Sequence, residues 1–280
     1  MNKQLPEQLR NLVSSGEEGL DLAAGALLIA SLEYPELDAG RYLADLDRMG
    51  REVNELAGSG AAPLDALRAL NRYLFEQQGF AGNHADYYDP RNSFLNDVLE
   101  RRTGIPVTLS VVYMEVARRA GLEVDGVPFP GHFLVKLTLE EGEVLLDPYS
   151  GGVSLSLEDV EARLAALGGG GQEARHAIPE LLNAASKRDI LLRMASNLRV
   201  IYRNNDDYPR LLALSELLLV LAPDDAEIYR DQALCYEGLE YPAGALKAYR
   251  RYLEHAGEPR DRDAVRERMV ELGAVAGNVH

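Results

Sequence analysis

The sequence predicts an α+β fold followed by an all-α segment. Helical periodicity fills the first third of the chain, short β-rich runs follow Gly121, and helical spacing returns after residue 172. Four consecutive glycines, Gly168–Gly171, separate the last two regions. Because glycine has no side chain to pack, we place a domain boundary there. One domain then covers residues 1–171, and a helical domain covers residues 172–280.

Composition indicates a globular, cytoplasmic protein. The 280 residues are 46% hydrophobic and carry a formal charge of -16, so the phosphate backbone of a nucleic acid would repel the chain. No apolar run approaches the roughly 20 residues that cross a bilayer, and residues 1–6 lack the apolar centre of a signal peptide. We therefore expect neither nucleic acid nor membrane as a partner. A single cysteine, Cys235, excludes an internal disulfide and a cysteine-based zinc cluster, and we expect it to pack inside a helical repeat.

The first third of the chain is predicted to be helical. Three helices are expected, over residues 18–32, 41–57 and 63–77. The first of them stops before Tyr34-Pro35, since the residue before a proline is pushed out of the α region. A polar loop over residues 82–92 follows. Ser93 is then the predicted N-cap of a short helix that ends at Gly104.

A small antiparallel sheet is predicted after Gly121. Three β-rich runs cover residues 122–127, 133–137 and 143–146. Gly142 between acidic neighbours is typical of a hairpin turn joining the last two runs. Such a hairpin places His132, at the start of one strand, and Asp147, at the end of its partner, at the same edge of the sheet.

The segment after the glycines has the spacing of tetratricopeptide repeats. Tyr208-Pro209 and Tyr241-Pro242 recur 33 residues apart, each opening a helix with proline at its favoured first position. Residues 224–227 supply an N-cap for the helix between them. In the second unit, large and small residues alternate as in this repeat: Tyr229, Ala233, Tyr236, Ala245 and Tyr249. Two repeats and a terminal helix over residues 260–272 are fewer than the number usually needed for a stable array, so we expect them to pack against the first domain.

The residues that could carry chemistry follow the order of a thiol acyl-transfer site. Such a site needs a nucleophile at a helix N-terminus, where the helix dipole favours thiolate, and a histidine oriented by a carboxylate. Here Gly104-Ile105-Pro106 opens an apolar helix, and His132 and Asp147 follow on successive strands, as in transglutaminase-like and papain-like thiol enzymes. The nucleophile is missing. His132 and Asp147 then form a residual dyad, with a purely structural histidine as the simpler alternative.

Several ordered motifs strongly resemble the bacterial SirB family. They are residues 26–30, 34–38, 82–83, 86–93, 102–106, 131–133 and 147–152. The resemblance implies a transglutaminase-like domain joined to C-terminal tetratricopeptide repeats. In active transglutaminase-like domains the pattern Gly-x-Cys precedes Arg-x-x-Gly, which is similar to Gly104-Ile105-Pro106 and Arg118-Arg119-Ala120-Gly121 here. The cysteine position falls on Pro106, so the resemblance implies a domain without its thiol catalyst.

Two hydroxyl residues are alternative nucleophiles. Thr108 and Ser110 lie two and four residues beyond Pro106. A helix turns about 100° per residue, so neither side chain projects where the cysteine would.

The polar loop invites a metal hypothesis, because the imidazole of His84 and the carboxylates of Asp86 and Asp89 could meet around a divalent ion. We favour a structural loop, since Asp and Asn bond readily to nearby backbone amides in turns. Tyr87 and Tyr88 are candidates, with Pro106, for lining a cleft beside His132.

These observations predict a noncatalytic protein-binding or regulatory module. Its partner is expected to be a protein or peptide seated between the helical array and the α+β domain, and no cofactor is expected. The main alternative is a hydrolase or acyl transferase of the same fold with a non-cysteine nucleophile. A weaker one is a metal-dependent hydrolase built on His84, Asp86, Asp89 and His132.

Overall fold

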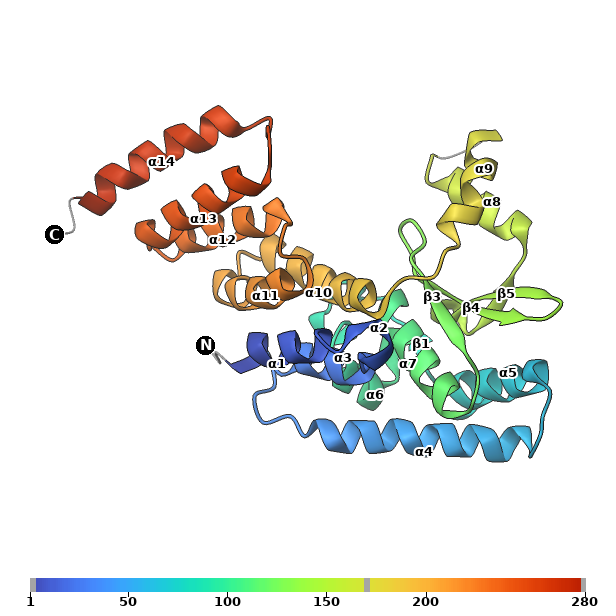
Figure 1. The fold of residues 1–280 in the computed structure, drawn as a ribbon. Coiled ribbons are helices and arrows are strands. Elements are labelled where there is room, and N and C mark those ends of the chain that lie inside the picture. The colour runs from blue at the N-terminus through green and yellow to red at the C-terminus, as the bar shows by residue number, and fades with distance from the viewer. Residues whose placement is uncertain (1–3, 169–171, 278–280) are drawn as a thin grey trace.

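Helices dominate the computed structural model, which describes residues 4–168 and 172–277 (Figure 1). The helical elements before the main sheet are α1 (Gln4–Val13), α2 (Gly16–Gly19), α3 (Leu22–Ala30), α4 (Ala39–Ala57), α5 (Pro63–Asn71), η1 (Arg72–Gln77, a π-helix), η2 (Pro90–Asn92), α6 (Leu95–Arg101) and α7 (Pro106–Arg119). Helix α7 is the centre of this part, because every residue over 106–117 is buried. A helix that is buried all round needs neighbours on all sides. They come from α3, α4, α5 and α6 and from the sheet.

Several helix ends differ from the predicted ones because of contacts that the local sequence pattern does not show. The helix predicted over residues 18–32 is interrupted after α2, because the side chain of Asp21 accepts the Ala24 N–H at 2.9 Å and starts α3 afresh. Ser93 is not the N-cap of α6. That position is Phe94, which has no side-chain cap but is buried against Tyr34 with its ring centroid 5.8 Å away.

The predicted end of this helix at Gly104 is also wrong. Helix α6 ends at Arg101, and Arg102 takes the left-handed conformation with φ of 58°. Its guanidinium lies 4.8 Å from the ring centroid of Phe80 and donates to the carbonyl of Leu99. These contacts hold a conformation that a non-glycine residue rarely adopts. Beyond it, β2 (Thr103–Gly104) pairs in parallel with β1 (Ala81–Gly82).

The main sheet is antiparallel, in the order β3-β4-β5-β6. Its strands are β3 (Val124–Val127), β4 (Leu134–Leu139), β5 (Gly142–Asp147) and β6 (Val153–Leu155). The predicted hairpin is present, with Glu140 and Glu141 in the turn and Gly142 opening β5 at φ of 144°. One face of the sheet packs on the core around α7. The other face packs on α8 (Leu157–Ala166) and α9 (Gln172–Leu181).

The repeat segment is a row of antiparallel helices. It comprises α10 (Lys187–Asn204), α11 (Tyr208–Leu221), α12 (Ala226–Gly238), α13 (Pro242–His255) and α14 (Arg262–Gly277), each packed on the next. The two Tyr-Pro pairs lie at the starts of α11 and α13, with Pro242 first in α13 as predicted and Pro209 second in α11, after Tyr208. Gly238 and Gly244 lie against tyrosine rings that a Cβ atom would strike, which is the close approach that small residues permit in such repeats.

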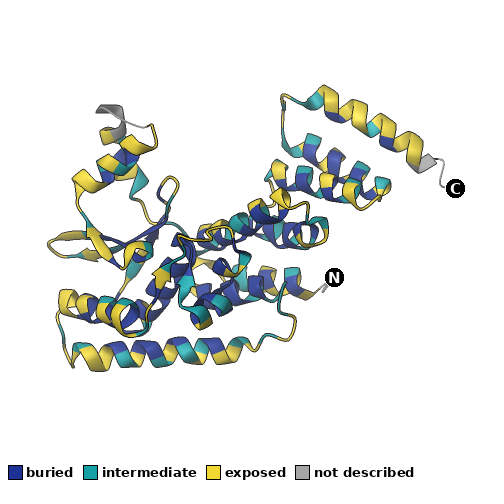
Figure 2. Ribbon diagram, turned by 180° about the vertical axis from the view of Figure 1, so that it is seen from behind, coloured by how far each residue is buried: buried dark blue, intermediate teal, exposed yellow. Residues whose placement is uncertain are grey.

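The repeats share a core with the first part of the chain. Helix α10 packs on α3 and α7, and α11 packs on α1. One cluster of buried residues includes members of α1, α3, α7, α10 and α11, and Figure 2 shows buried segments on both sides of this junction. Gly25 of α3 lies so close to Leu191 of α10 that a Cβ atom there would be 2.6 Å from a leucine methyl. At the surface of the junction, Arg210 donates to both carboxylate oxygens of Glu33 at 2.7 and 2.8 Å.

The predicted domain boundary stays a prediction, because residues 169–171 of the glycine run lie outside the described residues. Within residues 4–168 and 172–277, no helix has the length and apolarity needed to cross a membrane.

Candidate functional site

Pro106 occupies the start of the central helix. It is the first residue of α7, after an extended Ile105, and it is buried. Proline suits this position because its fixed φ is already helical and its missing N–H would have had no intrahelical acceptor. The helix N-terminus that would favour a thiolate therefore holds a pyrrolidine ring.

The structure brings His132 and Asp147 together. His132 lies just before β4 and Asp147 ends β5, and the register that pairs Val135 with Leu146 sets both at one edge of the sheet. His132 Nε2 lies 2.9 Å from Asp147 Oδ1. The antiparallel hairpin thus produces the juxtaposition that the sequence pattern predicts.

Asp147 is completely buried and surrounded by donors. Ser150 Oγ donates to Oδ2 at 2.8 Å, and Arg163 Nη2 donates to the same oxygen at 2.7 Å. The N–H groups of Tyr149 and Ser150 donate to Oδ1 at 3.1 and 3.3 Å, so Asp147 also caps the short helix η3 (Pro148–Ser150).

This donor set decides the charge of Asp147. Burial alone would raise its pKa, but the hydrogen bond and charge of His132 lower it. The hydrogen bonds from Arg163 and Ser150 lower it further, and together they hold the pKa of this carboxyl well below its usual range. Asp147 is therefore an ionised acceptor that fixes the orientation of the imidazole.

Sequence reasoning gave no role to three residues of this site: Tyr149, Ser150 and Arg163. The first two had a signal, because Asp-Pro followed by Ser is typical of a side-chain-capped turn. Arg163 had none, since it reaches Asp147 from α8.

Tyr149 connects the dyad to the polar loop. Its ring meets His132 edge-on at 5.7 Å between centroids and His84 at 4.6 Å, and its hydroxyl donates to the Asn83 carbonyl at 3.0 Å. Burial raises the pKa of Tyr149, as do the nearby Tyr87 and Asp147. Tyr87 and Tyr88 contact each other in the loop, with ring centroids 5.3 Å apart.

The alternative nucleophiles lie inside the protein. Thr108 and Ser110 are completely buried, and neither hydroxyl has a hydrogen-bond partner among the described residues. Neither is therefore hydrogen-bonded to His132, as a nucleophile and its general base would be.

The polar loop is held by its own amides and ion pairs. Asn83 Oδ1 accepts the Asp86 N–H at 3.0 Å, and Asn92 Nδ2 donates to the Asp86 carbonyl at 2.7 Å. Asp89 is paired with Arg91 at 2.8 Å and Arg101 at 3.2 Å. Among the described residues, no three His, Cys, Asp or Glu side chains form a group that could hold a metal ion. His84, Asp86 and Asp89 therefore do not converge on a common point where they could bind a metal ion.

Cys235 lies in α12, in the repeats. It is completely buried, and burial raises its pKa to about 12. A buried thiol of this kind acts as a small apolar side chain.

Comparison with known proteins finds two family matches in the chain. Residues 40–196 match the transglutaminase-like superfamily, and residues 198–270 match the tetratricopeptide repeat. A UPF0162 protein of Xylella fastidiosa (strain Temecula1) is 41% identical over 266 residues, which cover 94% of this chain and 93% of the relative. A UPF0162 protein of Vibrio cholerae is 27% identical over 246 residues, 88% of this chain and 90% of the relative.

A mammalian protein matches a smaller share of the chain. Human F-box only protein 21 is 30% identical over 181 residues, which cover 61% of this chain and 27% of that protein. No solved structure matches the chain. The predicted fold, an α+β transglutaminase-like part followed by helical repeats, is confirmed.

Proposed function

Because the chain belongs to the transglutaminase-like superfamily and carries tetratricopeptide repeats, we propose that it is a noncatalytic, cytoplasmic protein-binding module. Tetratricopeptide repeats commonly mediate protein–protein contacts. In this proposal Pro106 replaces the thiol nucleophile, and the pair His132–Asp147 holds the sheet edge and the adjoining loop. Membership of the SirB family stays a prediction, because the two bacterial relatives described above carry the name UPF0162.

The observation that carries this proposal is a groove of about 560 Å³ at the junction of α1 with α11, α12 and α13. Tyrosine and basic side chains line much of it, namely Arg10, Tyr229, Tyr236, Tyr241, Lys247 and Arg251. Tyrosine and arginine are enriched where proteins bind one another. In a chain with a formal charge of -16, this local excess of basic groups favours a partner segment that bears carboxylates.

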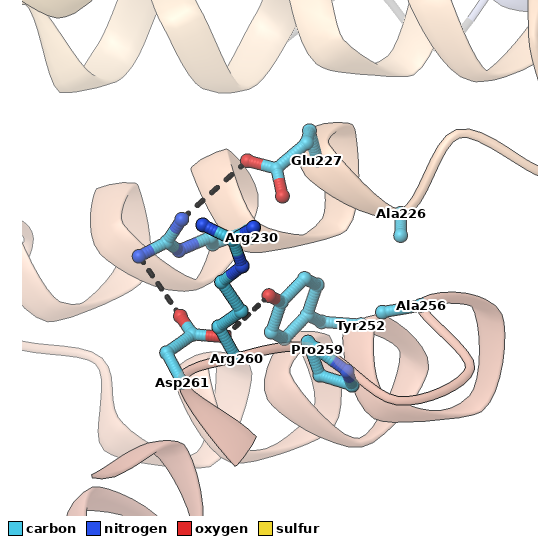
Figure 3. A pocket seen from close by; sticks show the side chains of 8 residues that line it. All are labelled: Ala226, Glu227, Arg230, Tyr252, Ala256, Pro259, Arg260 and Asp261. Carbon is cyan, nitrogen blue, oxygen red and sulfur yellow. Dashed lines mark hydrogen bonds and ion pairs between the residues drawn. The ribbon is translucent and has the colours of Figure 1, made fainter.

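A second hollow, of about 440 Å³, lies between α12, α13 and the start of α14 (Figure 3). Three of its four charged side chains, Glu227, Arg230 and Asp261, already pair with one another. Arg230 pairs with Asp261 at 2.9 Å and with Glu227 at 3.6 Å, and the Tyr252 hydroxyl donates to Asp261 at 2.7 Å. These contacts fasten α14 to the repeat before it, so we assign the hollow a structural role.

The test compares two charge reversals on one helix. The double variant Lys247→Glu, Arg251→Glu reverses two charges that line the groove. Arg250→Glu reverses one exposed charge of the same helix, α13, outside the groove. Each full-length protein is used to capture partners from native lysate, with quantitative mass spectrometry as the readout. We expect roughly tenfold lower capture of specific partners by the groove variant, equivalent to about 1.4 kcal/mol, and no change for Arg250→Glu. Equal losses for both, or none for the groove variant, would refute the groove.

The enzyme alternative is supported by the complete His132–Asp147 pair. Its test is turnover of an activated ester or amide by the full chain. Turnover that disappears in both His132→Ala and Thr108→Val would replace the binding module with a hydrolase or acyl transferase. Turnover that survives both changes, or is absent throughout, would remove this alternative.

A further inference from the structure

A pocket of about 340 Å³ lies at the junction between the repeats and the first part of the chain. Tyr202 of α10 and Arg210 of α11 line it from the repeats. From the first part come Tyr34, which follows α3, and Arg91 of η2. The pocket shares no residue with the groove beside α1, so a ligand bound here is independent of the partner proposed there. Its size is near the lower end of roughly 300–1,000 Å³, the range of small-molecule sites.

Tyr202 is the buried polar residue of this pocket. It is only 6% exposed, and its hydroxyl has no hydrogen-bond partner among the described residues. The hydroxyl oxygen still keeps some accessible surface, unlike the unpaired oxygens that are closed to solvent, which are those of Ser93, Asn96, Thr108 and Ser110. Four groups act electrostatically on the hydroxyl, and all of them line the pocket: Glu33, Tyr34, Asp207 and Arg210. The hydroxyl therefore faces the pocket. Since buried polar groups nearly always have a partner, a bound group would supply the one that is missing.

The hydroxyl of Tyr202 is a donor at neutral pH. Burial raises the pKa of this phenol, and so does the charge of Glu33, whereas Arg210 lowers it. The resulting pKa lies above its usual range, so the phenol keeps its proton. A protonated phenol can donate one hydrogen bond to an acceptor of a ligand. Tyr34 does not take this part, because its hydroxyl already donates to Asp97 at 2.7 Å.

The two guanidinium groups of the lining also keep donors to offer. Arg91 donates to Asp89 through Nε and Nη2, which leaves Nη1 without a partner among the described residues. Arg210 donates to Glu33 through Nε and Nη2 and to Asp207 through Nη1, so each terminal nitrogen retains a second N–H. The ion pairs at this junction join three carboxylates to three guanidiniums: Glu33, Asp89, Asp207, Arg91, Arg101 and Arg210. Because these charges balance while N–H donors remain, the pocket favours an acceptor ligand of low charge over a polyanion.

We propose that this junction pocket binds a monocarboxylate, either a small free acid or the side chain of an aspartate or glutamate in a peptide. The carboxylate accepts from the hydroxyl of Tyr202 and from an N–H of Arg210 on the repeat side, and Arg91 offers a further N–H from the first part. Phe94 and Ile201 supply apolar surface for the carbon body of the ligand. Binding would join the first part to the repeats, since each contributes donors.

The test is calorimetric titration of the full chain with two acids. Benzoate represents a free acid, and N-acetyl-glutamate amide represents a side chain in a peptide. Benzamide and N-acetyl-glutamine amide are their uncharged counterparts. About 0.15 M salt screens the net charge of the chain beyond roughly 8 Å. We expect a Kd of about 1 mM or tighter for at least one acid, because a ligand of few atoms has a limited affinity, and binding at least about tenfold weaker for its amide. The tighter acid identifies the source, and equal binding identifies the carboxylate alone.

Variants locate the binding. Tyr202→Phe removes only the hydroxyl and should weaken binding of the acid about tenfold. Because this hydroxyl has no partner within the described part of the chain, the urea midpoint of unfolding should not fall, as it would for a tyrosine whose hydroxyl holds the fold. Tyr88→Phe, in the exposed loop outside the pocket, should change neither the affinity nor the midpoint.

A second pair of variants removes a guanidinium. Arg91→Gln should weaken binding a few-fold. Arg68→Gln removes an arginine that also pairs with a nearby aspartate, but on the exposed face of α5, and should leave binding unchanged. If Tyr202→Phe fails to fold by circular dichroism, this second pair decides the matter. Binding that is absent for both acids, equal for the amides, or insensitive to the pocket variants would overturn the proposal, as would a lower urea midpoint for a folded Tyr202→Phe.

Discussion

Asp147 and Asp97 are two shielded carboxylates whose pKa values move in opposite directions. Burial acts first on both and would raise each pKa. At Asp147 the donors His132, Arg163 and Ser150 outweigh burial, and the pKa falls. At Asp97 the hydroxyl of Tyr34 and more distant arginine charges do not, so the pKa rises. The number and charge of the donors, rather than burial, therefore decide the direction in which the pKa of each carboxyl moves.

The sharpest test of this difference is removal of the buried carboxylate. We expect Asp147→Ala to lower the free energy of unfolding by about 3–5 kcal/mol, because Arg163 and the cap of η3 lose a buried partner. Urea denaturation gives the value. Asp125→Ala, at an exposed position of β3, should cost less than about 1 kcal/mol. A similar cost at both positions would contradict the role of the donor set.

Acid titration tests the same group through its charge. A lowered folded pKa means that Asp147 stabilises the folded state fully above its ordinary value of 3.8 and loses this contribution as the pH falls through the folded value. The stability difference between wild type and Asp147→Asn should therefore be constant from about pH 7 to 5 and shrink below about pH 4. Urea unfolding across this range measures it. A difference that grew with acid would reverse the sign of the pKa shift.

Thr108 is the opposite kind of buried polar group, one without a partner. Thr108→Val keeps the shape and removes the unpaired hydroxyl, so we expect a gain of about 1 kcal/mol in the free energy of unfolding. Thr138→Val, at an exposed position of β4, is the matched change and should stay within about 0.5 kcal/mol. A loss of stability at Thr108 would reveal a partner for its hydroxyl.

Asp97→Asn should have the smallest effect. The new side chain still accepts from Tyr34, and a carboxylate with a raised pKa gives up little when its charge is removed, so we expect a change within about 0.5 kcal/mol at neutral pH. The free energy of unfolding of the wild type should increase relative to that of the variant as the pH falls through the raised folded pKa, because protonation of Asp97 then favours the folded state. Thermal unfolding at several pH values follows this trend, and a trend of the same sign as that of Asp147 would remove the contrast between the two acids.

The parts of the structure that local pattern could predict are those that local chemistry decides. The hairpin turn at residues 140–141 and its register follow from the alternation of the strands, and they alone bring His132 to Asp147. The helix start at Pro242 of α13 was predicted for the same reason, and Pro209 lies one residue further in, second in α11.

The parts that could not be predicted depend on distant packing. Ser93 offered the better cap, but the burial of Phe94 against Tyr34 set the start of α6. Arg102 adopts a conformation that favours glycine because Phe80 lies under its guanidinium. Arg163 donates to Asp147 from α8, a contact that depends on how α8 packs on the sheet. The side-chain oxygen of Asn96 is unpaired among the described residues because of the residues that surround it in the fold, which the sequence pattern does not give.

The packing of α10 on α3 and α7 has a consequence for the synthesis of this protein. Helix α10 supplies Leu191, Met194 and Leu198 to the core of the first part, yet a long stretch of chain separates it from α7. Ribosomes add about 5–20 residues per second, so several seconds pass between the two helices. During that interval the nascent chain exposes the apolar surface that α10 will later cover. The first part of the molecule thus completes its folding only after the first repeat helix has left the ribosome, and until then that surface is open to chaperones and to aggregation.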